Sequence, residues 1–348
     1  MQKPTVFEVA AAAGVSVATV DRVLNNRKGV RPGTIERVQG AVERLGFRRD
    51  AFAAGLATRR RERYLFLLPS AGTNSFMAGL HRTVGGAAAR LAEQRVVIRP
   101  EEYAAFDEAA LVARLRAVDP ADTDGLALVG IDASAVRREI DRLAEGGLPV
   151  VTLVSDVTPS RRGRFVGIDN KAAGRVAASL IGRMAGERAG SVAIVVGQMT
   201  LHDHADRRLG FEQVIRREYP RLALLPALEG QDASARTRPM LERLLAERRD
   251  LVGIYSAGAG NRGIIAALDE APGSAADGAA PVVVAHELTA HARDALLSGT
   301  FTAVLHQDQE QEVDGAIAAL RTAVRPGMGF ERGDGPIHAQ IFLRDNVP

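Results

Sequence analysis

Hydrophobic positions follow two different periods along this chain, one near its start and another over most of its length. Between residues 5 and 45, apolar residues recur three and four positions apart, as they do on the buried face of a helix. From residue 64 onward, short apolar runs alternate with amphipathic stretches such as 205–217. This pattern predicts a small all-α domain followed by an α/β domain.

The first forty-five residues carry clear signals for the ends of helices. Thr5 and Glu8 match a capping box, and Gly14 can take the left-handed conformation that ends a helix. Ser16 is placed to cap a second helix, and the spacing predicts a third helix over 34–45. Two short helices joined by a tight turn are typical of a helix-turn-helix, although a three-helix unit can also dock onto another protein.

The charge distribution favours the DNA-binding alternative. The 348 residues carry a net charge of +3, but residues 1–61 hold twelve Lys and Arg against five Asp and Glu, a net charge of +7. The remaining residues carry a net charge of −4, so the basic head is the part suited to a polyanion.

Composition also excludes several classes of protein. There is no cysteine, so disulfides, thiolate catalysis and cysteine-based zinc sites are ruled out. Glu8 interrupts the apolar start of the chain, which argues against a secretion signal, and no apolar run approaches the length of a membrane span. We therefore expect a cytoplasmic protein.

In the body, β-strands are expected where short apolar runs are bounded by polar or turn residues. Their alternation with helices predicts parallel sheets with right-handed crossovers, and two lobes are more natural than one very large sheet. The fold class is therefore a small all-α helix-turn-helix domain followed by a two-lobed α/β domain with two parallel, doubly wound sheets. The expected strands are 64–68, 96–99, 125–129, 150–153, 165–168, 192–196, 222–225, 252–255, 282–285, 303–305 and 337–343.

Several segments of the head resemble the LacI-type family of bacterial transcriptional repressors. They are Thr5-Val6-Phe7-Glu8-Val9-Ala10, Ala13-Gly14-Val15-Ser16 and Thr19-Val20-Asp21-Arg22-Val23-Leu24-Asn25, and residues 51–57 resemble the family's hinge helix. The resemblance implies that Val17, Ala18 and Arg22 face base edges in the major groove. It implies phosphate contacts for Thr5, Ser16, Thr19 and Asn25, and minor-groove contacts for Ala53 and Leu56.

Asp21 departs from the family pattern, in which a small hydroxyl residue is usual at this position. A carboxylate about 4 Å from a phosphate is repelled by roughly 1–4 kcal/mol. Asp21 therefore either pairs with a neighbouring arginine or accepts a hydrogen bond from a cytosine amino group. The hinge is too short to hold a helix alone, and a plain flexible linker fits its Arg59-Arg60-Arg61 run equally well.

The body resembles the sugar-type periplasmic binding fold of LacI-type repressors. The resemblance rests on Asn74-Ser75-Phe76, Gly167-Ile168-Asp169-Asn170, Gly210-Phe211 and Gln307-Asp308. It implies an effector site between the lobes, most simply for a sugar or polyol. Asp169 and Asn170 also suit helix capping. The residues implied around the effector are Asn74, Phe76, Asp156, Asp169, Arg207, Asn261, Glu287 and Gln307.

The expected domain boundaries follow from these assignments. Residues 1–47 form the helix-turn-helix and 48–61 the hinge and linker. The N-terminal lobe is expected over 62–157 plus 289–322, and the C-terminal lobe over 158–288 plus 323–348.

The resulting hypothesis is a homodimeric repressor that binds near-palindromic operator DNA and a small effector. We expect no enzymatic activity, no cofactor and no metal site, and we expect His202-Asp203-His204 to lie in a solvated loop. The alternative is an NAD-sensing repressor or dehydrogenase, because Gly258, Gly260 and Gly263 follow an expected strand with the spacing of a dinucleotide fingerprint.

Overall fold

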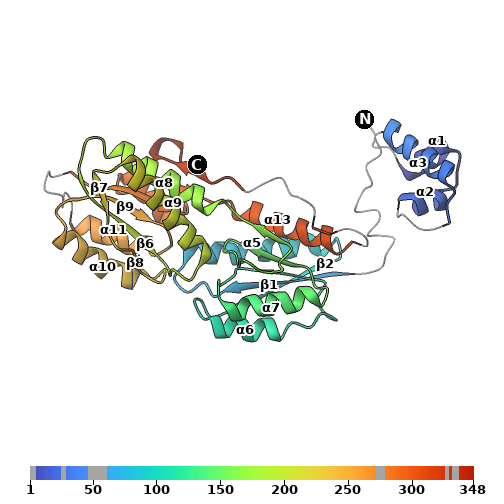
Figure 1. Ribbon diagram of the computed structural model, residues 1–348, viewed down its shortest axis with the longest axis horizontal. Helices are drawn as coiled ribbons and strands as arrows, with labels where there is room; N and C mark the ends of the chain where they lie inside the picture. The colour runs from blue at the N-terminus through green and yellow to red at the C-terminus, as the bar shows by residue number, and fades with distance from the viewer. Residues whose placement is uncertain (1–4, 25–28, 46–60, 272–278, 326–328, 331–336) are drawn as a thin grey trace. The chain divides into compact units, whose positions relative to one another are not determined.

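The computed structural model describes residues 5–24, 29–45, 61–271, 279–325, 329–330 and 337–348. The chain divides into two compact units, residues 1–61 and 62–348, which are described separately below. Figure 1 shows the three helices of the first unit and the layered sheets of the second.

The first unit, the head, is a helix-turn-helix with a third helix packed against it. Its helices are α1 (Val6–Ala13), α2 (Val17–Leu24) and α3 (Pro32–Leu45). The predicted capping box is confirmed, because Thr5 and Glu8 each bond the other's backbone N–H. Gly14 ends α1 with φ 63°, as predicted. The buried core of the head contains Val9, Ala10, Ala13, Val20, Val23, Val38 and Ala41.

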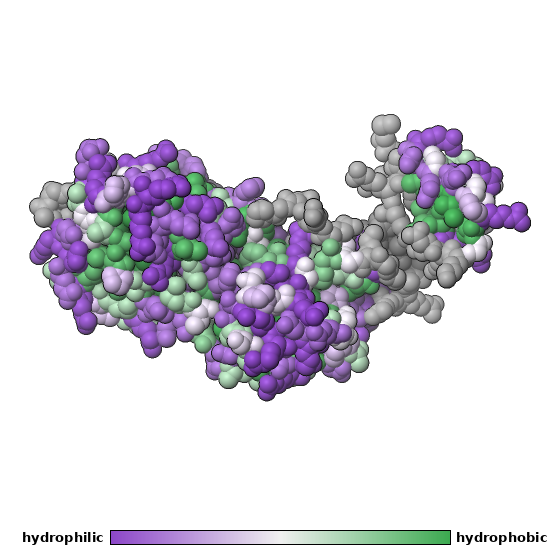
Figure 2. All heavy atoms as spheres, viewed as in Figure 1, coloured by the Kyte–Doolittle hydropathy of each residue, from purple (hydrophilic) through white to green (hydrophobic). Residues whose placement is uncertain are grey.

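The second unit contains two parallel sheets, each with helices on both faces, as the sequence predicted. In the first lobe the strand order is β2-β1-β3-β4-β5. The strands are β1 (Glu62–Pro69), β2 (Val96–Tyr103), β3 (Gly125–Leu128), β4 (Val150–Leu153) and β5 (Arg164–Val166). Helices α5 (Ser75–Ala92) and α13 (Gln309–Ala323) cover one face, and α6 (Glu108–Arg116) and α7 (Ser134–Glu145) cover the other. Hydrophilic residues cover much of the outward face of α6 and α7 (Figure 2).

In the second lobe the strand order is β12-β11-β10-β9-β6-β7, with short β8 paired to β6 and β12 antiparallel to β11. The strands are β6 (Gly190–Val196), β7 (Leu222–Leu224), β8 (Leu228–Glu229), β9 (Leu251–Ser256), β10 (Val282–His286), β11 (Ala303–His306) and β12 (Gln340–Phe342). The helices are α8 (Asn170–Met184), α9 (His202–Glu218), α10 (Ser234–Glu247), α11 (Asn261–Glu270) and α12 (Ala290–Ser298), and a 3₁₀ turn, η1 (Arg344–Asn346), follows β12. The sequence did not predict β8.

The lobe boundaries differ from those predicted at two places. Residues 158–166 belong to the first lobe, because β5 pairs with β4 in parallel register. Residues 289–306 belong to the second lobe, because β11 pairs with β10 and α12 packs beside it. Residues 158–163, between β4 and β5, are therefore a loop within the first lobe.

The chain passes between the lobes after β5, after β11 and after α13. The first and third of these passages are joined to each other. Ile168 and Ile337 form an isolated parallel bridge, and the Ile337 N–H donates to the Gly167 carbonyl at 3.1 Å.

Candidate functional site

Helix α2 presents the side chains that the sequence assigned to DNA bases. Ala18 and Arg22 are exposed on its surface. Val17 is only half-exposed and packs against the core of the head, so it presents less surface than expected. Asp21, the departure from the family pattern, is half-buried on the same helix.

The hydroxyl groups expected at phosphates lie at helix N-termini. Thr5 is held in the capping box of α1, where its Oγ1 accepts from the Glu8 N–H at 3.4 Å. Ser16 Oγ accepts from the Thr19 N–H at 3.2 Å and lies 2.9 Å from Thr19 Oγ1. Asn25, Ala53 and Leu56 fall outside the described residues. The capping bonds orient these hydroxyls at the exposed ends of α1 and α2, where backbone N–H groups favour anions.

In the second unit, loops at the carboxyl ends of the parallel strands enclose a cavity of about 260 Å³ between the lobes. We call it the interlobe cavity. This is where doubly wound sheets bind ligands. Its walls combine apolar side chains, including Phe76, Tyr103 and Phe106, with a few charged ones. Five of the eight side chains predicted around the effector line it: Asn74, Phe76, Arg207, Glu287 and Gln307.

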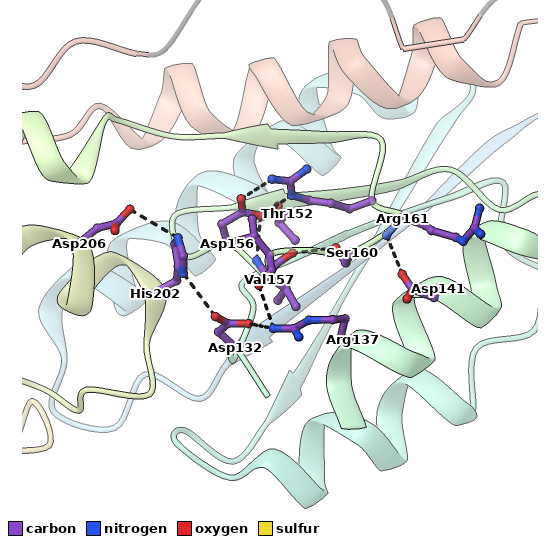
Figure 3. Close-up of polar contacts among 12 residues, drawn as sticks. Asp132, Arg137, Asp141, Thr152, Asp156, Val157, Ser160, Arg161, His202 and Asp206 are labelled. Carbon is purple, nitrogen blue, oxygen red and sulfur yellow. Dashed lines mark hydrogen bonds and ion pairs between the residues drawn. The ribbon is translucent and has the colours of Figure 1, made fainter. Parts of the chain in front are cut away.

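Asp156 is not among the residues that line the interlobe cavity, because the loop between β4 and β5 uses its carboxylate. It accepts from Thr152 Oγ1 at 2.6 Å and from the Val157 N–H at 2.8 Å, and it pairs with Arg162 (Figure 3). Burial opposes its ionisation, but these bonds outweigh burial and lower the pKa of Asp156. Its position is structural, contrary to the prediction.

Asp169 and Asn261 also lie outside the interlobe cavity. Asp169 caps α8 by accepting from the Ala172 N–H at 2.8 Å, so the helix-capping interpretation is confirmed. Asn261 is buried at the start of α11, where it accepts from Ser256 Oγ at 2.7 Å and donates to the His286 carbonyl at 3.0 Å. Neither side chain is free to meet a ligand in the cavity.

Arg207 is held rigidly in the cavity wall. Its Nε donates to Asn170 Oδ1 and its Nη1 to the Ala257 carbonyl, both at 2.8 Å. Its Nη2 has no hydrogen-bond partner and lies 4.0 Å from Asp203 Oδ2. A buried guanidinium with one free nitrogen is a group awaiting an acceptor.

Asp203 and His204 were expected in solvent, but they are 5% and 3% exposed and line the cavity. Because α9 begins at His202, residues 203, 204 and 207 share one face of the helix. Starting the predicted helix at residue 202 instead of 205 would have placed Asp203 and His204 on the same face as Arg207. Burial opposes ionisation of Asp203, but the nearby His204 and Arg207 outweigh it and lower the pKa of Asp203.

Glu287 lies at the end of β10 with φ 69°, a conformation that is strained for a residue with a side chain. Its Oε2 faces His306 Nδ1 at 3.2 Å and accepts from the Gln307 N–H at 3.4 Å. Its Oε1 has no partner. Among the described non-glycine residues with positive φ, five of six line the cavity: Phe106, Val154, Gln231, Asp232 and Glu287. Strain of this kind is concentrated at binding sites.

Two polar contacts join the lobes beside the cavity. Asn74 caps α5 through Oδ1, and its Nδ2 donates to Asp232 Oδ2 of the second lobe at 3.0 Å. His202 lies between Asp132 of the first lobe and Asp206 of its own helix, each 3.4 Å from a different ring nitrogen (Figure 3). The described conformation is therefore one in which the lobes touch around the cavity.

The glycines of the apparent dinucleotide fingerprint are packed against protein rather than open to a pyrophosphate. A Cβ on Gly260 would lie 2.6 Å from Thr237 Oγ1, and one on Gly263 would lie 2.5 Å from the Ser234 carbonyl oxygen. These glycines allow α10 and α11 to approach closely. The geometry does not support the dinucleotide alternative.

Within the described parts of the chain, no group of three His, Asp or Glu side chains is arranged to hold a metal ion. None of the helices in these parts of the chain is both long enough and apolar enough to cross a membrane.

Comparison with known proteins agrees with this architecture. Residues 5–50 match the family described as bacterial regulatory proteins, lacI family, and residues 65–327 match the periplasmic binding protein domain. Catabolite control protein A of Priestia megaterium is 40% identical over 80 residues, which are 23% of this chain and 24% of that protein. The regulator GalS of Salmonella typhimurium is 29% identical over 209 residues, 60% of this chain and 58% of that protein.

Among solved structures, a solute-binding protein of Burkholderia graminis in complex with D-arabinose shares 19% identity and a TM-score of 0.73, covering 82% of this chain and 96% of that one. The glucose-galactose binding protein GanP of Geobacillus stearothermophilus shares 18% identity and a TM-score of 0.72, covering 83% of this chain and all of that one. These likenesses establish the fold of the second unit. With its lacI-type head and its periplasmic binding protein domain, the chain belongs to the LacI family of bacterial regulatory proteins.

Proposed function

We propose that this chain is a transcriptional repressor that binds operator DNA through its head and changes its DNA affinity when a small polar effector occupies the interlobe cavity. A single observation carries the proposal. One chain joins an exposed α2 on a basic head to a cavity whose walls hold unpartnered polar atoms. Its role is binding rather than catalysis.

The head supports DNA binding by its charge and by the side chains that α2 exposes. Arg22 is exposed on α2 and can form two hydrogen bonds with guanine in the major groove. Ala18, also exposed, offers a small apolar contact to a thymine methyl group. The net charge of +7 over residues 1–61 favours phosphate contacts and a steep dependence on salt.

The cavity supports a small polar effector. Asp203, Arg207 and Glu287 are buried around it, each with an atom lacking a hydrogen-bond partner. Buried polar groups are rarely left unpaired, so a ligand that completes these bonds is favoured. Phe76 and Tyr103 add apolar surface suited to the flat face of a sugar or polyol ring.

Coupling between cavity and DNA requires two states of the lobes with different effector affinity. The contacts of Asn74 with Asp232 and of His202 with Asp132 belong to the closed state. We propose that closure changes the geometry with which a homodimer presents its two heads to a near-palindromic operator. Linkage then requires operator DNA to change effector affinity by the same factor by which effector changes DNA affinity.

The experiment is operator selection followed by fluorescence anisotropy with Arg22→Ala. We expect selected sites to be near-palindromic, and the variant to lose about 1–3 kcal/mol of binding free energy with relaxed specificity at one base position of each half-site. Arg216→Ala, which removes an exposed arginine from α9, is the matched control and should bind DNA normally. Normal operator recognition by Arg22→Ala would contradict the assignment of α2 as the reading helix.

A further inference from the structure

The interlobe cavity offers more acceptor atoms than donor atoms to a ligand. Among the described side chains that line it, the buried atoms without a partner include Asp203 Oδ1 and Glu287 Oε1, which as carboxylate oxygens only accept. Arg207 Nη2 is a donor, and the Ser155 hydroxyl, which lies beside the Asp203 carboxylate and lowers its pKa, can act either way. A ligand that satisfies this wall must therefore be rich in donors.

The balance of charge points in the same direction. Three carboxylates line the cavity, those of Asp203, Asp232 and Glu287, against the guanidinium of Arg207 and the imidazole of His204. Asp232 is already satisfied by the Asn74 side chain and the Ala259 N–H. The two carboxylates that keep a free oxygen are both less than a tenth exposed. Buried carboxylates are costly unless a cation and hydrogen bonds compensate them.

A buried glutamate, Glu312, lies close enough to the cavity wall for the charges of Glu287, Arg207 and Asp203 to act on it. Glu312 of α13 is fully buried, and neither of its carboxyl oxygens has a hydrogen-bond partner. Burial is the main cause that raises its pKa well above the usual value, and the charges of Glu287 and Asp203 raise it further. The same two carboxylates also act on Tyr255, so they lie in one neighbourhood.

We propose that the effector carries a protonated amine, bound by the free carboxylate oxygens of Asp203 and Glu287, and that it is an amino sugar or amino polyol. This inference rests on the proposed function of the cavity as an effector site. An ammonium group supplies three N–H donors and the positive charge that the wall lacks. A neutral hydroxyl supplies one donor and no charge. A phosphorylated sugar would bring further negative charge toward carboxylates that are already buried, which Coulomb repulsion disfavours.

The groups around Asp203 and Glu287 leave each carboxylate able to accept a hydrogen bond from an ammonium group. At Glu287, His306 Nδ1 lies 3.2 Å from Oε2 and His286 Nδ1 lies 4.0 Å from Oε1. At Asp203, His204 Nε2 and Arg207 Nη2 lie 3.8 Å and 4.0 Å from Oδ2. Asp203 Oδ1 and Glu287 Oε1 are nevertheless left without a hydrogen bond. Aromatic and aliphatic side chains line much of the rest of the cavity, and a low-dielectric wall of this kind strengthens an ion pair formed against it.

The test is isothermal titration of the full-length protein with matched probes at neutral pH. D-glucosamine and D-galactosamine are compared with D-glucose and D-galactose, and with the two N-acetylated amino sugars, which keep the nitrogen but lose its charge. We expect at least one amino sugar to bind tenfold or more tightly than both its neutral parent and its N-acetyl derivative. In Asp203→Asn and Glu287→Gln, each close in shape to the native side chain, that preference should shrink to less than threefold.

Glu242→Gln, which removes an exposed carboxylate from α10 of the same lobe, should retain the full preference. The comparison of probes on the wild-type protein does not depend on any variant folding. A neutral hexose that binds as tightly as its amino counterpart would overturn the amine while supporting the effector site. Absence of binding by both amino sugars would overturn the amine as well. Failure of the proposed function appears separately, as loss of operator binding in the anisotropy assay.

Discussion

Helices α8 and α9 approach so closely that the substitution Gly174→Ala sets two known effects against each other. Gly174 is buried in α8, and a Cβ at this position would lie 2.0 Å from the Arg207 carbonyl oxygen and 2.9 Å from the Phe211 nitrogen. Both are backbone atoms, which cannot move without moving α9. By contrast, replacing glycine by alanine inside a helix ordinarily stabilises it by about 0.5–1 kcal/mol.

The steric clash should outweigh the gain in helix propensity. Overpacking a well-packed site costs about 1–3 kcal/mol, and contact with backbone rather than a flexible side chain places Gly174→Ala toward the upper end of that range. After subtraction of the helix-propensity gain, we expect the free energy of unfolding to fall by about 2 kcal/mol. Because the displaced backbone belongs to Arg207, effector affinity should fall as well.

The matched control is Gly86→Ala in α5, where a Cβ meets no atom within 4 Å. There only the helix-propensity effect operates, so the protein should gain about 0.5–1 kcal/mol. Urea unfolding followed by tyrosine signal measures both variants, because all four tyrosines lie in residues 62–348 and there is no tryptophan. If Gly174→Ala proved as stable as wild type, the close contact of α8 with α9 would not constrain the fold as argued.

Three further predictions concern the charged groups at the interlobe cavity. Burial raises the pKa of Glu312 in the folded protein well above its usual value, so stability is lost as pH rises above 4.5. Glu312→Gln should therefore be more stable than wild type at pH 7, with the difference vanishing near pH 4 in thermal unfolding. Burial acts to lower the pKa of His306, but the bond with Glu287 raises it overall. The stabilisation from this pair is therefore complete below pH 6.5 and is lost as pH rises through the folded-state pKa. His306→Gln should lower the free energy of unfolding at pH 5.5 and lower it less at pH 8.5. Asn74→Asp keeps the cap of α5 but sets a carboxylate against Asp232, so small-angle scattering should show a more open body, and an unchanged profile would refute the role of this contact in closure.

Local features of this protein were predictable from its sequence because they depend on neighbouring residues. The capping box of Thr5 and Glu8 and the left-handed Gly14 lie within one helix and its ends, and both were found where expected. The parallel strands were likewise located from their apolar runs, apart from the two-residue β8. Such features require only the period and the residue types on either side.

Features that depend on distant partners were less predictable. Residues 303–306 look alike whether they join the first sheet or the second, and only pairing with β10 decides the lobe. Asp156 resembles a ligand-binding residue until Arg162, six positions later, folds back onto it. Asp203 looked solvated because its burial depends on residues distant in sequence that line the same cavity, such as Tyr103 and Glu287.

The hydrogen-bonded bridge between Ile168 and Ile337 has a mechanical consequence for the lobes. Where Ile168 and Ile337 lie side by side, the backbone hydrogen bond lets the two segments bend together but resists sliding of one along the other. Motion of one lobe against the other is thereby reduced toward a single opening angle. With one such angle, occupancy of the cavity is transmitted as a single change, the degree of lobe opening. A substitution that separates Ile337 from Gly167 should also allow the lobes to twist and so weaken the effect of the effector on DNA binding.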